Sequence, residues 1–272
     1  MEFFPQQIMP QPTADLPLAQ VYQFLMAKPD LIATIGRAIR KAFDEVIDGP
    51  RTGRFMIEQL EKTEKTYIGT KVEIVLRAEL ELERGLVLDN RICGHEVDTK
   101  FSISEGWMIP REAVGQICLL VAGNDNAGTF VTGLLRMTED VLTPGANQDG
   151  KRNVSAKGKQ SILWLAHKLP MPQNFLLHLH PQVRGQIMSQ NSGMQRVRAL
   201  FQSVTGRIIP RTAIEQVAQQ KDPMRRARQT KASLAQEGYR VLCATYEADR
   251  AWFHHYGFYN FDNDDWLSIK IS

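Results

Sequence analysis

Two short, mostly apolar runs in the middle of the chain do most to limit its fold. Residues 117–122 and 130–135 have the length of β-strands, with Gly, Asn or Asp residues close by. Strands that are apolar on both sides are buried on both faces of a sheet, so the runs predict central strands covered by other layers. Both are far shorter than the ~20 apolar residues of a membrane-spanning helix. We therefore expect a globular protein built around a sheet.

Two segments of the first half have apolar residues at helical spacing. The first runs from Ile32 to Val46, with Asp30 placed as an N-cap and Asp-Gly-Pro at 48–50 to end the helix. The second repeats the spacing across residues 68–76. Both patterns predict helices that pack one apolar face on the sheet.

Alternation with a period of two predicts extended chain after the second helix. Leucines alternate with glutamates across 79–83, which is typical of a half-buried strand. Residues 86–89 and 95–101 predict two further strands, joined as a hairpin through 90–94. The first half is therefore expected to be α/β, a mixed sheet flanked by helices.

The net charge of +3 hides a difference in sign between the two halves. Residues 1–150 carry 15 Lys and Arg against 22 Asp and Glu, whereas residues 151–272 carry 18 against 8. Such asymmetry is typical of a polyanion-binding module joined to another domain, because clustered cations displace counterions from phosphate backbones. A solvated basic surface is the alternative.

The second half has the pattern of a DNA-binding module. Residues 194–204 and 214–218 have helical apolar spacing, and Asp222-Pro223 predicts the cap and first turn of a basic helix. A strand follows at 239–244, completing the order of a winged helix-turn-helix. The polar segment 143–159 predicts the domain boundary. We expect a first domain over 1–155, a linker over 156–165 and a mainly helical winged-helix domain over 166–272.

Asp98 and Lys100 are the strongest candidates for chemistry. Strand alternation places both side chains on one face, and Asp89 lies nine residues earlier, at the end of the preceding predicted strand. Pairing of the strands would bring Asp89 and Asp98 to one hard cation; Mg²⁺ suits them, because it keeps positions open for water and phosphate oxygens. Glu73 is expected to point into the same cluster, where it would either hold a second cation or order the nucleophilic water. Lys100 would orient or deprotonate water, or stabilise charge on the phosphate.

Two groups of basic residues are expected to bind DNA phosphates. The first lies on the predicted basic helix and comprises Arg225, Arg226, Arg228 and Lys231. The second precedes Glu73 and comprises Arg51, Arg54, Lys62 and Lys65. Because glutamates interleave with this second group, a solvated surface is an equally open interpretation.

Asp89, eight intervening residues and then Asp98-Thr99-Lys100 resemble the active-site pattern of the PD-(D/E)XK nuclease superfamily. Longer stretches are similar to the NaeI-type type II restriction endonucleases: GPRTGRFMIEQLEKTEKTYIGTKVEI, GHEVDTKFSIS and VAQQKDPMRRARQ followed by LAQEGY. The likeness runs from about residue 43 to the C-terminus. Two departures are visible: Leu88 precedes Asp89 where the superfamily's name has proline, and the chain is shorter than the family's type member.

The resemblance implies a restriction-endonuclease-like domain followed by a winged-helix domain similar to that of the catabolite activator protein. It implies a homodimer that cleaves duplex DNA with Mg²⁺, leaves 5′-phosphates and binds separate DNA copies through its two domains. Carried over by position, the family's acidic set falls on Glu73, Asp89 and Asp98, and its catalytic lysine on Lys100.

The working hypothesis is therefore a magnesium-dependent restriction endonuclease. A nicking or repair nuclease with the same core is one alternative, and a transcriptional regulator whose first half only dimerises is another. The N-terminal segment has an acidic second residue and no apolar core of signal-peptide length. The three cysteines form no CxxC pair, which argues against disulfides and zinc. Both observations favour a cytoplasmic protein.

Overall fold

The computed structural model describes residues 14–271 and divides into two compact units, each described by itself. The first unit contains the chain up to Phe43 together with Lys62–Pro172, and the second contains Asp44–Glu61 together with the chain from Gln173. Residues 1–13, which carry much of the expectation that no secretory signal is present, lie outside the described residues. Within the described part, no helix is long and apolar enough to cross a membrane.

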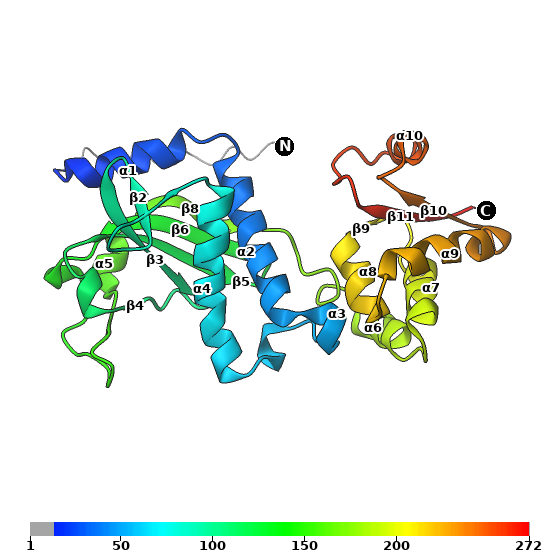
Figure 1. Ribbon diagram of the computed structural model, residues 1–272, viewed down its shortest axis with the longest axis horizontal. Helices are drawn as coiled ribbons and strands as arrows, with labels where there is room; N and C mark the ends of the chain where they lie inside the picture. Colours follow the sequence, from blue (N-terminus) through cyan, green and yellow to red (C-terminus); the bar gives the residue numbers. More distant parts are fainter. Residues whose placement is uncertain (1–13, 272) are drawn as a thin grey trace. The chain divides into compact units, whose positions relative to one another are not determined.

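The first unit is built on a six-stranded sheet of order β1-β2-β3-β5-β6-β8 (Figure 1). Only β3 and β5 pair in parallel, so the sheet is mixed, as expected. Its strands are β1 (Glu83–Arg84), β2 (Asn90–Ile92), β3 (His95–Ser102), β5 (Ile117–Asn124), β6 (Thr129–Arg136) and β8 (Leu163–Pro170). The remaining elements are α1 (Leu16–Met26), α2 (Leu31–Ile47), α4 (Lys62–Glu79), β4 (Met108–Ile109), η2 (Arg111–Ala113), η3 (Glu139–Val141), β7 (Arg152–Asn153) and α5 (Ala156–Gln160).

Different elements cover the two faces of this sheet. Helices α2 and α4 cross one face (Figure 1), where Phe43 of α2 packs edge-on against Phe101 of β3. An ion pair of 2.9 Å joins Lys41 of α2 to Glu79 of α4. The opposite face is covered by an apolar cluster from the loops around β4, η3 and α5, centred on Trp107. The central strands β5 and β6 are consequently buried on both faces, which confirms the interpretation of their apolar runs.

The predicted hairpin exists, but its first strand and its turn lie at different residues. Strand β2 occupies part of the segment expected as the connection, and residues 86–89 form a bend instead of a strand. The turn is Cys93-Gly94, with φ of 51° and 82°, because a two-residue hairpin needs left-handed backbone at both positions. The strand expected over 79–83 was also wrong: α4 continues to Glu79 and only Glu83–Arg84 is extended.

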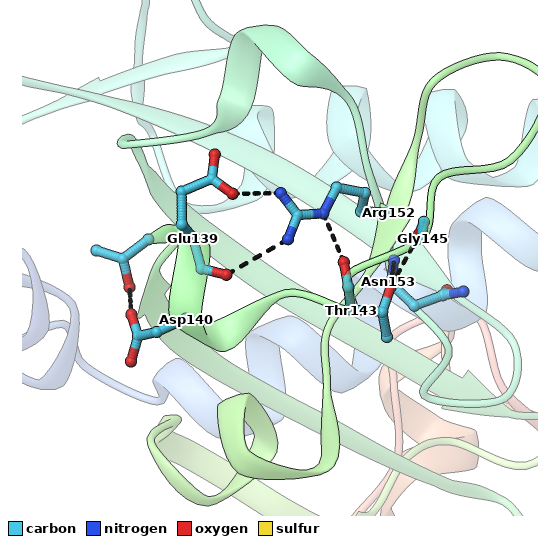
Figure 2. A network of polar contacts seen from close by, with 7 residues as sticks. Glu139, Asp140, Thr143, Gly145, Arg152 and Asn153 are labelled. Atoms are coloured by element: carbon cyan, nitrogen blue, oxygen red, sulfur yellow. Dashed lines mark hydrogen bonds and ion pairs between the residues drawn. The ribbon is translucent and has the colours of Figure 1, made fainter.

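The polar segment 143–159 is an ordered excursion of the first unit rather than a boundary. Figure 2 shows Arg152 bonded to Glu139 and to the Thr143 carbonyl, while the Asn153 N–H donates to Thr143 Oγ1 at 3.2 Å. Strand β7 pairs with β4, and the expected linker over 156–165 contains α5 and the start of β8. The units divide after Pro172 instead. The polar composition resembles that of a linker, but the polar groups of this segment form hydrogen bonds within the excursion.

The second unit combines a helical cluster with a three-stranded sheet of order β10-β11-β9. Its elements are α3 (Gly49–Thr52), η1 (Ile57–Gln59), α6 (Pro181–Met188), α7 (Gly193–Ser203), β9 (Ile208–Ile209), α8 (Arg211–Ala218), α9 (Pro223–Gln236), β10 (Tyr239–Cys243), α10 (Glu247–His255) and β11 (Trp266–Lys270). The predicted helices α7, α8 and α9 and the strand β10 are confirmed. Asp222 caps α9, since its Oδ1 accepts from the Arg225 N–H at 3.1 Å.

Candidate active site

Asp98 and Lys100 lie on one face of β3 and form an ion pair. Lys100 Nζ is 2.8 Å from Asp98 Oδ2, and the aspartate side chain is almost completely buried. The two side chains meet because residues two apart on a strand point to the same side, as the alternation predicted. Thr99, between them, points to the opposite face and accepts a hydrogen bond from Asn90 Nδ2 at 2.9 Å.

Asp89 reaches the same site from the bend before β2. The Thr99 backbone N–H donates to Asp89 Oδ2 at 2.7 Å. Burial raises the pKa of Asp98, and the nearby Asp89 side chain adds to the rise. The structure therefore brings together the two aspartates that the sequence analysis paired.

Glu73 lies beside this pair but is held by an arginine. On α4, Arg77 Nη1 lies 3.4 Å from Glu73 Oε1 and donates to the Asp89 carbonyl oxygen at 3.0 Å. Burial raises the pKa of Glu73 and the charge of Asp89 adds to the rise, whereas Arg77 opposes it. Glu73 is thus an electrostatic neighbour of the aspartates, linked to Asp89 through Arg77.

Burial dominates the electrostatics of the site. It raises the pKa of Asp98 to about 6, with Lys100 opposing the shift and Asp89 adding to it. Burial also disfavours the charge of Lys100, but the hydrogen bond and charge of Asp98 outweigh this effect and raise the pKa of Lys100. Lys100 is therefore an ammonium that donates hydrogen bonds, which favours its expected charge-stabilising role over proton abstraction.

The donor set suits a hard divalent cation bound by few protein ligands. Among the described residues, no three His, Cys, Asp or Glu side chains are gathered closely enough to hold a metal ion. Two adjacent carboxylates in a poorly solvated position repel each other, however, and a cation between them would relieve that repulsion. Mg²⁺ commonly uses one or two carboxylates and keeps its water ligands, so Asp89 and Asp98 fit it.

Three residues of the site were not singled out from the sequence. Cys118 of β5 pairs with Asp98 in the sheet register, with its Sγ 3.8 Å from Asp98 Oδ2, and burial raises the pKa of its thiol well above the usual range. Arg77 bonds Asp89 and Glu73, as described above. Glu96 shares the face of β3 with Asp98 and accepts three backbone N–H groups. Only Glu96 had a signal in the sequence, the same alternation that selected Asp98.

The expected basic group before Glu73 is divided between the two units. Arg51 and Arg54 belong to the second unit, where Arg51 pairs with Asp48 at 2.5 Å and Arg54 donates to the Ile47 carbonyl. Lys62 and Lys65 belong to the first unit and are exposed on the first turn of α4.

Helix α9 presents most of the other basic group to solvent. Arg225 and Arg228 are exposed, and Arg226 is half-buried and donates to Gln229. Lys231 differs, because its Nζ lies 2.8 Å from Asp249 and over the ring of Trp266. Its ammonium is therefore occupied by contacts to Asp249 and Trp266 within the second unit.

Comparison with known proteins places the chain in a family. A family model described as Restriction endonuclease NaeI matches residues 21–272. The chain is also 42% identical to the type II restriction enzyme NaeI of Lentzea aerocolonigenes over 209 residues, which are 74% of this chain and 65% of that protein. The region matched by the family model covers the second unit and most of the first, including the aspartate pair and α9. This chain therefore belongs to the NaeI restriction endonuclease family.

Proposed function

We propose that this protein is a type II restriction endonuclease that hydrolyses duplex DNA with Mg²⁺ and leaves 5′-phosphates. One observation carries the proposal: the Asp98–Lys100 ion pair lies beside Asp89 on a mixed sheet, in a chain of the NaeI family. Carboxylates that bind a cation and an ammonium that meets a phosphate are the groups that phosphodiester hydrolysis requires.

Each residue of the site has a proposed role. Asp89 and Asp98 would hold the metal, which supplies charge neutralisation and an acidified water, and Glu73 would complete this acidic set. Lys100 donates to an oxygen of the scissile phosphate and stabilises its developing negative charge. Water adds to phosphorus and the bond to the 3′ oxygen breaks, which leaves the phosphate on the 5′ end.

The second unit is proposed as a winged-helix DNA-binding domain. Helices α8 and α9 are joined by a short turn, and the adjacent antiparallel sheet supplies the strands of the wing. Arg225, Arg226 and Arg228 would contact DNA phosphates from α9. We further propose that the protein is a cytoplasmic homodimer and that this domain binds a second DNA copy.

Digestion of a plasmid of known sequence tests the reaction directly. With Mg²⁺ the protein should give discrete fragments whose ends are joined by DNA ligase without prior phosphorylation, and chelation should stop cleavage. Asp98→Ala should abolish cleavage while gel-shift binding persists. Ligation only after phosphorylation would overturn the proposed end chemistry.

The same assay separates the alternatives. A nicking or repair nuclease would convert supercoiled plasmid to open circles without linear product. A transcriptional regulator would bind DNA in the gel shift and leave the plasmid intact with every divalent cation. Sedimentation with and without DNA tests the homodimer, and titration with a second duplex carrying the site tests the effector copy.

A further inference from the structure

The bend that precedes Asp89 displays two neighbouring apolar side chains to solvent. Leu86 is 85% exposed and Val87 is 84% exposed, the highest values among the described large hydrophobic residues. Single exposed apolar residues are ordinary, but two adjacent ones beside a candidate active site need an explanation. Moving both side chains out of water into a binding interface would lower the free energy.

One carboxylate binds three successive backbone N–H groups of the bend. Glu96 accepts the backbone N–H groups of Leu86, Val87 and Leu88 at 3.0, 3.1 and 2.8 Å. Three successive N–H groups around one anion form a compact nest. Leu86 and Val87 are therefore presented on a pinned backbone, and the entropy cost of ordering them on binding is reduced.

Glycine at position 85 is required for this arrangement. A Cβ there would collide with the Leu88 carbonyl oxygen and with Glu96 Oε2. The Gly85 N–H also donates to the Asp89 carbonyl oxygen at 3.2 Å, which closes the bend onto the residue that reaches the active site. The bend is thus a specifically hydrogen-bonded structure next to the active site.

Strand β3 carries residues that hold both the bend and the active site. Glu96, Asp98 and Lys100 alternate along β3 on the same face, so the strand that carries the ion pair also anchors the bend. Leu86 is three residues from Asp89, at most about 11 Å along an extended chain. This span is similar to the width of the major groove of a DNA duplex, so DNA cleaved at Asp89 and Asp98 would lie within reach of the bend.

We propose that Leu86 and Val87 form a rigid apolar contact against the sugars and base edges of the duplex next to the cleaved phosphate. The proposal rests on the proposed function, because continuity with the active site identifies DNA as the occupant. Charged residues of both signs border the bend, Glu83 and Glu96 together with the exposed Arg84 and Arg91. Apolar side chains can touch DNA there without adding charge repulsion.

The test combines a double substitution with a photocrosslink. Leu86→Ala with Val87→Ala should lower kcat/KM for a duplex carrying the mapped site about 10-fold or more, with an unchanged melting temperature. Leu16→Ala is the matched control, since Leu16 of α1 is a leucine of the same unit with 71% exposure, and it should leave cleavage unchanged. Benzophenone-alanine in place of Leu86 should crosslink to plasmid DNA, and in place of Leu16 should not.

The outcomes separate this inference from the nuclease assignment. Suppose that the wild-type protein cleaves DNA, that the double variant has the same kcat/KM, and that position 86 gives no crosslink. This combination would overturn the apolar contact and leave the proposed nuclease activity standing. Crosslinking to a second protein chain instead of DNA would also overturn it. A DNA crosslink from a protein that never cuts would support the contact and overturn the proposed catalysis.

Discussion

The backbone N–H of Thr99 donates a 2.7 Å hydrogen bond to Oδ2 of Asp89, so the strand that carries Asp98 also orients the second carboxylate. Thr99 points its side chain to the opposite face, where Asn90 donates to its hydroxyl. A single residue thereby connects the bend, both strands of the hairpin and the site. The distance between the two carboxylates depends on this hairpin, whose tight turn fixes the register.

Replacing Lys100 by methionine should slow DNA cleavage by about 10²–10³-fold, because the ammonium that stabilises charge on the phosphate is lost. Plasmid cleavage measures the rate, and a thermal melt checks that the variant folds. Lys41→Met is the control, since Lys41 pairs with Glu79 on an exposed surface of the same unit. Cleavage at the wild-type rate by Lys100→Met would contradict the role.

Replacing Arg77 by alanine should lower cleavage about 10-fold and raise the Mg²⁺ concentration needed for half-maximal rate. Arg77 touches neither substrate nor metal in this proposal; it positions Asp89 through the backbone carbonyl and Glu73 through the carboxylate. Arg77→Lys should bring the Mg²⁺ concentration needed for half-maximal rate part of the way back to the wild-type value. Arg37→Ala, at an exposed arginine of α2 that bonds Thr34, should change neither quantity; an equal effect there would refute the positioning role.

Substitutions on α9 should separate DNA contact from packing. Arg225→Ala and Arg228→Ala should each weaken DNA binding, and each should reduce the slope of log K against log salt by about one, because one phosphate contact is lost. Lys231→Ala should leave that slope unchanged and instead lower the free energy of unfolding by about 1 kcal/mol, through loss of Asp249 and the Trp266 ring. Fluorescence anisotropy at several salt concentrations and chemical denaturation measure the two effects; a reversed pattern would be inconsistent with this division.

Asp265 should make the stability of the second unit depend on pH. Burial raises its pKa from 3.8 to about 6, and the charges of Asp262 and Asp264 add to the rise. Since the folded-state pKa is the higher one, the native state holds an extra proton between these values, and stability is lost as pH rises through this window. Asp265→Asn keeps the acceptor for the Asp262 N–H and removes the charge.

The Asp265→Asn variant should accordingly be more stable than wild type by about 1–2 kcal/mol at pH 7.5, a figure reduced for partial solvation, with the difference vanishing near pH 4. Denaturant unfolding at both pH values measures it. A variant no more stable than wild type at pH 7.5 would rule out the buried charge as the cause.

Local sequence pattern misplaces elements of this chain where nonlocal contacts decide the structure. The leucine–glutamate alternation over 79–83 indicated a strand, but Leu80 and Leu82 are buried in the segment that directly follows α4. The polar excursion around Arg152 resembled a linker, because a list of residues does not show that Glu139 and Thr143 accept its guanidinium.

By itself, the sequence determined the helices α2, α4, α7, α8 and α9, the buried strands β5 and β6, and the shared face of Asp98 and Lys100, because periods of 3.6 and 2.0 residues are properties of the local backbone. Tertiary structure decided that Cys118 lies against Asp98, that Arg77 supports Asp89, and that Glu96 pins the bend displaying Leu86 and Val87. Those relationships depend on strand register and on the approach of a helix to the sheet. Packing of the whole unit sets both, and no short window of sequence contains them.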